Sequence, residues 1–295
     1  MSSTSERIGF VGLGAMGVGM AANVIKAGYA TTVLGNTRRE PVDRLVAAGA
    51  TEASSARELG ETCDIVVLCV TTSDVVESLI TGGQGLLSGS HKSFLVIDCG
   101  TSRPDSTMAL GKTLEKAGCS MMDVPLGRTP EAAEAGNLNM MAGGSEADFA
   151  RAKPLLETMS ENLFHLGPLG TGHKIKLLNN AFSMSVATLA TEIVSSARAM
   201  DVDIGLLRDV MVAGPNRSDF FEWMLAAAAD GDDTKIDFAL KNGLKDVRYF
   251  NALAEAVSAR ADIPRIAETR MAAAVDAGEG DSRIPALIRI AEQQH

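Results

Sequence analysis

Cysteine and long hydrophobic runs are both scarce in this sequence, and each absence excludes a class of protein. The four cysteines among 295 residues, Cys63, Cys69, Cys99 and Cys119, lie far apart. They lack the close pairing of a zinc site, so we expect no metal site and reduced, buried thiols. No apolar run approaches the roughly 20 residues that span a bilayer. Because the opening residues MSSTSER also lack a signal peptide's apolar region, we expect a cytoplasmic protein.

Basic residues are also in deficit. The chain has 27 Lys and Arg against 37 Asp and Glu, a formal net charge of −10. Nucleic acids and anionic membranes bind spread-out positive charge, so neither is an expected partner. With 46% apolar and 22% charged residues, the composition is typical of a folded soluble protein, and the length suffices for two domains. Any anion that the protein binds must therefore be held by local groups.

The first 165 or so residues alternate β-rich runs with helical patterns. This alternation predicts an α/β domain, a Rossmann-type doubly wound parallel sheet with helices on both faces. We place this NAD(P)-binding domain at residues 1–168. The predicted strands are 8–12, 31–34, 65–70, 94–97, 120–124, 138–142 and 163–166.

The pattern changes after Gly172. Residues 174–200 contain no Gly or Pro, which predicts one interdomain helix of about 25 residues and about 40 Å. Its apolar residues recur at helical spacing at Leu178, Phe182, Val186, Leu189 and Ile193. Later segments predict only helices, near 204–212, 219–229, 238–261, 264–277 and 284–293. We expect residues 169–295 to form an all-helical substrate domain that completes its core in a homodimer or homotetramer.

A glycine-rich turn follows the first predicted strand. The spacing of Gly12, Gly14 and Gly17 provides a tight turn, close approach of the backbone to a pyrophosphate, and tight helix–strand packing. The sequence thus predicts a dinucleotide site. Its expected residues are Gly12, Leu13, Gly14, Ala15, Met16 and Gly17 in the turn, with Val70, Thr71 and Thr101 after later strands.

The residues after the second predicted strand bear on the choice between NADH and NADPH. An acid there would bind the ribose diol and repel a 2′-phosphate. This chain has Asn36 and Thr37, followed by Arg38 and Arg39. The pattern favours NADPH or dual use, with Asn36, Thr37 and Arg38 at the ribose. The alternative is that the two arginines are a solvated pair at the start of the next helix.

Polar residues at the start of the interdomain helix suggest acid catalysis. Reduction of a carbonyl requires a proton at the oxygen as negative charge develops there, and Lys176 is the candidate donor. Asn179, Asn180 and Ser183 follow at helical spacing and extend the same stripe. The alternative is a solvated lysine with two capping amides. We expect His173 to face the pyrophosphate or solvent.

Arg128 follows a predicted strand and precedes a helix. A guanidinium there could clamp an anionic group, with backbone N–H groups of Gly127 and Thr129 close by. The alternative is pairing with a neighbouring acid, Glu131 or Glu134.

The order of these segments resembles the β-hydroxyacid dehydrogenase family over almost the whole chain. The resemblance rests on Gly12-x-Gly14-x-x-Gly17, Asp98-Cys-Gly-Thr101-x-x-Pro104, Asp123-Val-Pro125-x-Gly127, Gly170-x-Gly172-x-x-x-Lys176-x-x-Asn179-Asn180 and Lys245-Asp246. It implies hydride transfer between a nicotinamide cofactor and a small β-hydroxy acid. By resemblance Lys176 is catalytic, Asn180 orients the substrate, and Lys245 with Asp246 lies near the nicotinamide.

One departure from the family pattern concerns the substrate. Leu126-Gly127-Arg128 stands where common members have Ser-Gly-Gly. It is similar to the variant in sulfolactaldehyde reductases, whose arginine binds a sulfonate and whose counterparts of Asn179 and Ser183 lie at the substrate. This resemblance implies reduction of 3-sulfolactaldehyde to 2,3-dihydroxypropane-1-sulfonate. Arginine also binds carboxylates, so 3-hydroxyisobutyrate, tartronate semialdehyde or succinate semialdehyde chemistry stays open, as does a nucleotide-binding redox sensor.

Overall fold

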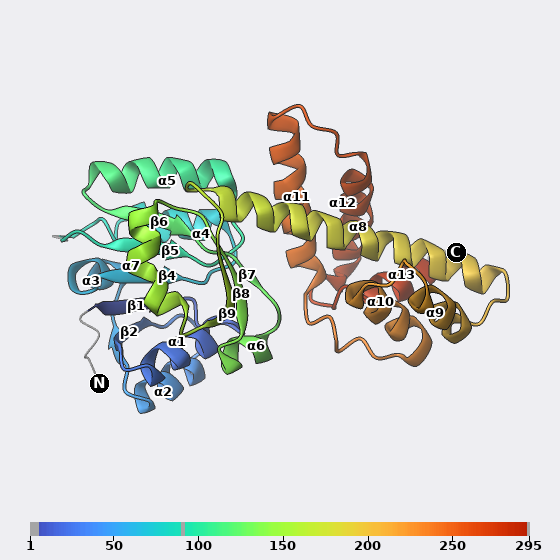
Figure 1. Cartoon of the computed structure of the whole chain (residues 1–295), viewed down its shortest axis with the longest axis horizontal. Helices are drawn as coiled ribbons and strands as arrows, with labels where there is room; N and C mark the ends of the chain where they lie inside the picture. Colours follow the sequence, from blue (N-terminus) through green and yellow to red (C-terminus); the bar gives the residue numbers. More distant parts are fainter. Residues whose placement is uncertain (1–5, 90–91, 294–295) are drawn as a thin grey trace. The chain divides into compact units, whose positions relative to one another are not determined.

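The computed structural model describes residues 6–89 and 92–293 and contains two compact units, which join in the chain between Lys176 and Leu177. The first unit is α/β and the second is helical, as the sequence predicts (Figure 1).

A six-stranded parallel sheet forms the centre of the first unit, in the order β3-β2-β1-β4-β5-β6. The strands are β1 (Arg7–Val11), β2 (Ala30–Leu34), β3 (Thr51–Ala53), β4 (Ile65–Leu68), β5 (Leu95–Asp98) and β6 (Ser120–Asp123). The helices between them are α1 (Gly17–Lys26), α2 (Glu40–Ala47), α3 (Ala56–Thr62), α4 (Ser73–Thr81) and α5 (Pro104–Lys116).

Helices cover both faces of this sheet, which explains why its central strands are largely apolar. Side chains alternate between faces along a strand. In β4, Ile65 and Val67 accordingly belong to one hydrophobic core, with residues of α1 and α2, whereas Val66 and Leu68 belong to another, with residues of α3, α4 and α5. The predicted doubly wound sheet is confirmed.

The last two predicted strands, however, lie in a second sheet. β7 (Leu126–Gly127), β8 (Leu138–Ala142) and β9 (Ser160–His165) form it, with β7 antiparallel to β8 and β8 parallel to β9. The prediction that all seven runs share one parallel sheet is therefore wrong. Helix α6 (Pro130–Ala135) is too short for a crossover that returns the chain in parallel, so β8 runs back along β7, whereas the longer α7 (Glu146–Leu156) permits a parallel β9.

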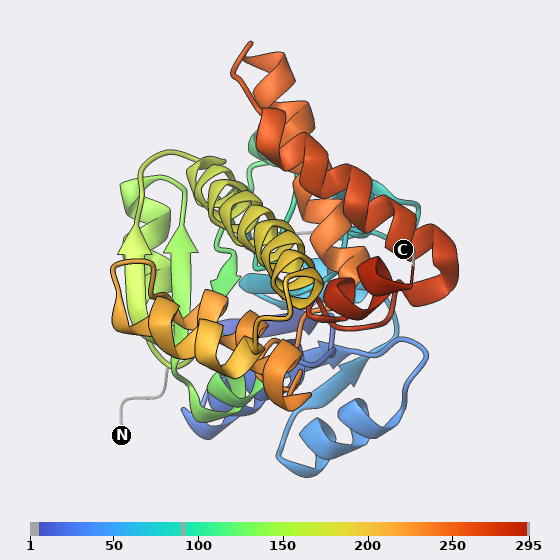
Figure 2. The ribbon, with the colours of Figure 1, turned by 90° about the vertical axis from the view of Figure 1, so that its right-hand side faces the viewer.

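The described residues of the second unit form helices and one isolated bridge, with no longer strand. Helix α8 (Thr171–Ala199) begins in the first unit. It is followed by α9 (Ile204–Ala213), α10 (Asp219–Asp230), α11 (Leu240–Ala256), α12 (Asp262–Ala274), a π-helical turn η1 (Val275–Glu279) and α13 (Ala286–Glu292). Helices α11 and α12, orange to red in Figure 2, pack side by side. The predicted helix 238–261 ends earlier, since Ser258 adopts a left-handed φ of 55°.

The apolar stripe predicted along α8 is only partly buried: Val186 packs against the core of the second unit, whereas three of the larger side chains are exposed. Leu178, Phe182 and Leu189 expose 56%, 69% and 56% of their surface. Small residues dominate the opposite, buried face, which contains Ala181, Met184, Ala187, Ala190, Val194 and Ala197. Because several large apolar side chains are exposed along one helix, this face has the character of an interaction surface.

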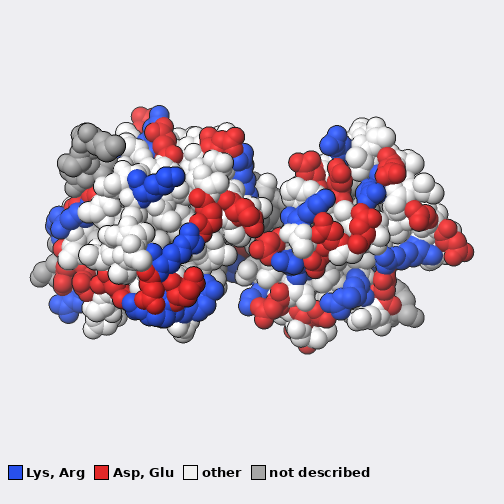
Figure 3. All heavy atoms as spheres, turned by 90° about the horizontal axis from the view of Figure 1, so that it is seen from below, with Lys and Arg blue, Asp and Glu red and all other residues white. Residues whose placement is uncertain are grey.

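All four cysteines are free, as expected. Burial raises the pKa of the Cys69 thiol to about 12, so the thiol stays protonated at neutral pH and reacts poorly. No helix among the described residues is long and apolar enough to cross a membrane. On the face shown in Figure 3, acidic and basic side chains are interspersed over each unit.

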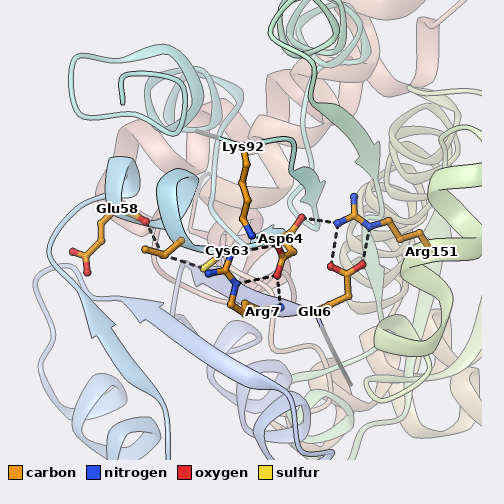
Figure 4. A network of polar contacts seen from close by, with 8 residues as sticks. Glu6, Arg7, Glu58, Cys63, Asp64, Lys92 and Arg151 are labelled. Carbon is orange, nitrogen blue, oxygen red and sulfur yellow. Dashed lines mark hydrogen bonds and ion pairs between the residues drawn. The ribbon is translucent and has the colours of Figure 1, made fainter. Parts of the chain in front are cut away.

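A network of charged residues surrounds Asp64 at the amino end of β4 (Figure 4). The Asp64 carboxylate accepts hydrogen bonds from the backbone N and the Nε of Arg7, at 2.9 and 3.0 Å, and pairs with Lys92 Nζ at 2.8 Å. Arg151 of α7 donates to the Asp64 carbonyl oxygen at 3.1 Å and pairs with Glu6 at 2.9 Å. Burial opposes ionisation of Asp64, but the hydrogen bonds from Arg7 and Lys92 outweigh it and hold the pKa well below its ordinary value.

We expect Asp64→Asn to lower the free energy of unfolding by about 1–2 kcal/mol at pH 7, since Arg7 and Lys92 are half exposed and partly screened. A depressed pKa means that the ionised carboxyl adds stability above the unfolded pKa, near 3.9, and loses that effect as the pH falls toward the folded pKa. The difference in free energy of unfolding between wild type and Asp64→Asn should therefore become smaller below about pH 4. Urea unfolding at several pH values measures it. Asp276→Asn, an exposed acid, is the control, and a gap independent of pH would contradict the assignment.

Candidate active site

The carboxyl edge of the six-stranded sheet has a natural binding position between β1 and β4. The strand order reverses direction there, and open α/β sheets bind ligands at such points. Gly12 follows β1 with a φ of 93°, which only glycine adopts readily. A Cβ on Gly12 would lie 2.2 Å from the carbonyl oxygen of Cys69, which follows β4. The turn can therefore pack against the end of β4 only with glycine at this position.

The other two glycines of the turn differ in their surroundings. A Cβ on Gly17 would lie 1.9 Å from the Gly12 carbonyl oxygen, so glycine is needed for α1 to begin beneath the turn. A Cβ on Gly14 would meet nothing within 4 Å. The space beside Gly14 is open, and the first turn of α1 has no acidic residue and no side-chain cap. Open space and available N–H groups at a helix N-terminus fit a pyrophosphate.

The remaining cofactor residues predicted in the first unit lie at the same edge of the sheet. Because parallel strands end together, the segments after β2, β4 and β5 bring Asn36, Thr37, Arg38, Val70, Thr71 and Thr101 to this side of the sheet. Arg39 does not serve as a free cation. Its guanidinium binds Glu52 at 2.6 and 2.8 Å and Asp43 at 2.8 Å, whereas Arg38 is exposed. Of the two arginines, Arg38 is therefore the one available to a 2′-phosphate.

Arg128 lies in a left-handed turn between β7 and α6. Its φ of 78° is unusual for a residue with a side chain, and such conformations cluster at functional sites. Nη1 donates to the Asn137 carbonyl oxygen at 2.8 Å and pairs with Glu161 of β9. The described residues provide no partner for Nε or Nη2, which leaves donors for an anion. The side chain does pair with an acid, as the alternative interpretation held, but the acid is Glu161 and neither Glu131 nor Glu134.

The predicted polar stripe lies on α8. Lys176 is partly exposed, Asn179 is exposed and Asn180 is buried. The Asn179 amide donates to Asn180 Oδ1 at 3.2 Å, and the Ser183 hydroxyl donates to the Asn179 carbonyl oxygen at 3.2 Å. Because α8 begins at Thr171, neither amide caps the helix, and the capping alternative is wrong.

In the second unit, Asp246 of α11 contacts two other predicted site residues, Asn180 and Lys245. It is 1% exposed, and its Oδ2 accepts a hydrogen bond of 2.6 Å from the Asn180 amide. Lys245 Nζ lies 2.9 Å from Asp246 Oδ1 and 5.1 Å from the centre of the Tyr249 ring. The hydrogen bond from Asn180 fixes the orientation of its amide, so the Asn180 oxygen is turned toward Asn179.

His173 does not face solvent or a pyrophosphate, so that prediction is wrong. The residue is completely buried between the ends of β5 and β6, where Asp98 and Asp123 are also completely buried. Thr107 of α5 completes the contact, with Oγ1 at 2.9 Å from His173 Nδ1. The sequence motifs contain both aspartates, but no pattern marks Thr107, which is 66 residues away.

Two protein-family profiles match the chain. The profile for the NAD binding domain of 6-phosphogluconate dehydrogenase matches residues 7–167, and the profile for NAD-binding of NADP-dependent 3-hydroxyisobutyrate dehydrogenase matches residues 170–291. A cofactor of the NAD(P) type, expected from the glycine turn, is thereby confirmed.

Similar proteins include several dehydrogenases and reductases. The chain is 36% identical to NAD-dependent L-serine dehydrogenase of Pseudomonas aeruginosa over 220 residues, 75% of this chain and 72% of that protein. It is 33% identical to 3-sulfolactaldehyde reductase of Escherichia coli over 204 residues, 69% and 68% of the two chains. The structure of 3-hydroxyisobutyrate dehydrogenase from Salmonella typhimurium aligns with a TM-score of 0.84 at 26% identity, covering 97% of this chain and all of that one. The chain belongs to the β-hydroxyacid dehydrogenase family and is an NAD(P)-dependent oxidoreductase.

Proposed function

We propose that the protein reduces 3-sulfolactaldehyde to 2,3-dihydroxypropane-1-sulfonate, reversibly, with NADPH or with either nicotinamide cofactor. The proposal rests on Arg128. Its backbone is left-handed, and its Nε and Nη2 have no partner among the described residues. A sulfonate offers three acceptor oxygens to such a fork of donors. The exposed Arg38, with no acid at the end of β2, supports use of NADPH.

In the proposed mechanism each polar residue has a separate task. A bound nicotinamide cofactor supplies the hydride. Lys176 donates a proton to the carbonyl oxygen as negative charge develops there. Asn180, whose amide is fixed by Asp246, orients the carbonyl or the lysine. The residues that we assign to binding of the sulfonate are Arg128 and Asn179, with Gly127, Thr129 and Ser183.

The alternative substrate class is a carboxylate aldehyde, as in 3-hydroxyisobutyrate, tartronate semialdehyde or succinate semialdehyde chemistry. Relatives of both kinds have similar identity, since 3-hydroxyisobutyrate dehydrogenase of Pseudomonas aeruginosa is 34% identical over 204 residues. Overall similarity therefore does not separate the two classes. The distinction depends on what Arg128 prefers to bind.

We expect wild type to prefer sulfolactaldehyde over tartronate and succinate semialdehydes by tenfold or more in kcat/KM, and Arg128→Ala to lose this preference. A tenfold loss corresponds to about 1.4 kcal/mol of discrimination. Steady-state kinetics with NADH and NADPH measures both the substrate and the cofactor preference. Glu161→Gln leaves the guanidinium in place and should keep the sulfonate preference. A wild-type preference for a carboxylate would overturn the sulfonate assignment and return the site to the wider family.

We also propose a homodimer or homotetramer. The support is the exposed apolar face of α8, where Leu178, Phe182 and Leu189 are each more than half exposed. A second copy that covers this face would remove a large apolar surface from water.

A further inference from the structure

The first unit contains a buried polar cluster for which the proposed function gives no role. It consists of Asp98 at the end of β5, Asp123 at the end of β6, Thr107 in α5 and His173 in the first turn of α8. Asp98, Asp123 and His173 are 0% exposed and Thr107 is 1% exposed. Buried polar groups cost stability unless they are satisfied by specific partners, so a cluster of this kind fixes a particular arrangement.

Asp123 holds the start of α8. Its Oδ1 accepts a hydrogen bond from Gly170 N at 2.7 Å, and its Oδ2 accepts one from His173 N at 2.6 Å. These bonds satisfy N–H groups that a helix start otherwise leaves without partners. A Cβ on Gly172 would lie 2.2 Å from the Met141 carbonyl oxygen and 2.8 Å from that of Asp123. The first turn of α8 is therefore packed directly on the ends of β6 and β8.

The imidazole of His173 connects this turn to two further elements. The Thr107 hydroxyl donates to the Arg103 carbonyl oxygen at 3.1 Å and forms a hydrogen bond of 2.9 Å with His173 Nδ1. On the other side of the ring, His173 Nε2 lies 3.7 Å from Asp98 Oδ2. Asp98 is itself fixed, because it accepts hydrogen bonds from Gly100 N at 2.9 Å and from the Ser102 hydroxyl at 2.8 Å.

The contacts of His173 and Asp98 lie close in the chain to two predicted site residues. Lys176 follows His173 by three residues, about one turn of the same helix. Thr101, one of the predicted cofactor residues, lies inside the loop that Asp98 holds. Through Thr107 the imidazole ties the turn that precedes the lysine to α5, and its Nε2 lies 3.7 Å from the Asp98 carboxylate that holds the loop after β5.

We propose that His173 is a positioning residue for Lys176, which sets where the lysine ammonium lies relative to the cofactor edge of this unit. The inference rests on the proposed role of Lys176 as proton donor. Small misplacements of a catalytic group lower turnover strongly, by about 10²-fold for an error of 1 Å. Loss of the imidazole contact should therefore lower kcat and leave cofactor binding nearly unchanged, because the glycine turn lies on another strand.

The test compares variants of His173 and Thr107 with a matched control. We expect His173→Leu and Thr107→Val to lower kcat by about 10- to 100-fold, with the Kd for NADPH changed less than about threefold. His173→Asn keeps a donor for Thr107 and should restore most of the lost turnover. Thr113→Val is the control, since this exposed threonine of α5 makes the same kind of bond, to the Ala109 carbonyl oxygen at 3.1 Å. It should retain wild-type kcat.

A second measurement separates positioning from general damage to the fold. If His173 acts through Lys176, His173→Leu should have little further effect on the residual turnover of Lys176→Ala. Full kcat in folded Thr107→Val and His173→Leu would overturn the inference, as would a parallel loss of kcat and NADPH affinity that His173→Asn does not restore. If Lys176→Ala itself retains turnover, the proposed function fails. If that variant is inactive while His173→Leu is fully active, only the positioning inference fails.

Discussion

Replacement of Lys176 by alanine is expected to reduce kcat by about 10²–10⁴-fold, the usual contribution of a general acid. Without the ammonium, the oxygen that receives charge during hydride transfer has no proton from the protein. The NADPH Kd should change little, because the glycine turn predicted to bind the pyrophosphate contains no part of α8. Steady-state turnover combined with fluorescence titration of NADPH measures both quantities.

Lys174 provides a control on the same helix. It is an exposed lysine in the turn before Lys176, and its side chain leaves the helix in a different direction. Lys174→Ala should therefore keep wild-type kcat. Comparable losses in the two variants would indicate a general effect of positive charge, and turnover retained in Lys176→Ala would defeat the assignment of the proton donor.

The three glycines of the β1–α1 turn should give three separable results. Gly17→Ala should destabilise the first unit by about 3 kcal/mol or more, because its Cβ would lie 1.9 Å from a backbone oxygen that cannot move aside. Gly12→Ala should behave similarly, with a Cβ 2.2 Å from Cys69 O and a left-handed φ. Gly14→Ala should unfold like wild type but raise the cofactor Kd by about tenfold or more, or about 1.4 kcal/mol, since a methyl group there would occupy space reserved for the pyrophosphate.

Thermal unfolding and cofactor titration on the three variants check this prediction. Each glycine serves as a control for the others, because all three changes add the same methyl group. Wild-type cofactor affinity in Gly14→Ala would show that the pyrophosphate does not approach this residue. Wild-type stability in Gly17→Ala would show that the turn can relax without cost.

Much of the first unit could be predicted because its signals are local. The glycine spacing after β1 and the apolar strands each depend on residues close in sequence, and the helical domain follows from periodicity alone. The sequence does not predict strand β7, because its two residues are too few to show the alternation of apolar and polar side chains that marks a strand. Periodicity correctly predicts a helix from the spacing of Leu178, Phe182 and Leu189, but it cannot tell a buried face from an exposed one.

The unpredicted parts of the site depend on contacts between distant residues. Arg128 and Glu161 are 33 residues apart, and Thr107 and His173 are 66 apart. His173 was expected to face outward because it lies near a helix start. The direction of its side chain is set by contacts with β5, β6 and α5. The residues next to His173 in the sequence do not indicate these contacts. Asp123 and Asp98 stand in the motifs, yet their hydrogen bonds to backbone N–H groups depend on strands meeting at one edge.

The backbone at residue 128 has an evolutionary consequence. Its φ of 78° is comfortable for glycine and costs other residues about 1–2 kcal/mol, and common members of the family carry glycine at this place. The turn therefore has a geometry better suited to glycine than to the arginine that occupies it. Substitution of Arg128 by glycine would relieve the backbone strain and remove the guanidinium in one step. On the proposal that Arg128 binds the anionic group of the substrate, that binding is the advantage that offsets the strain of its left-handed backbone.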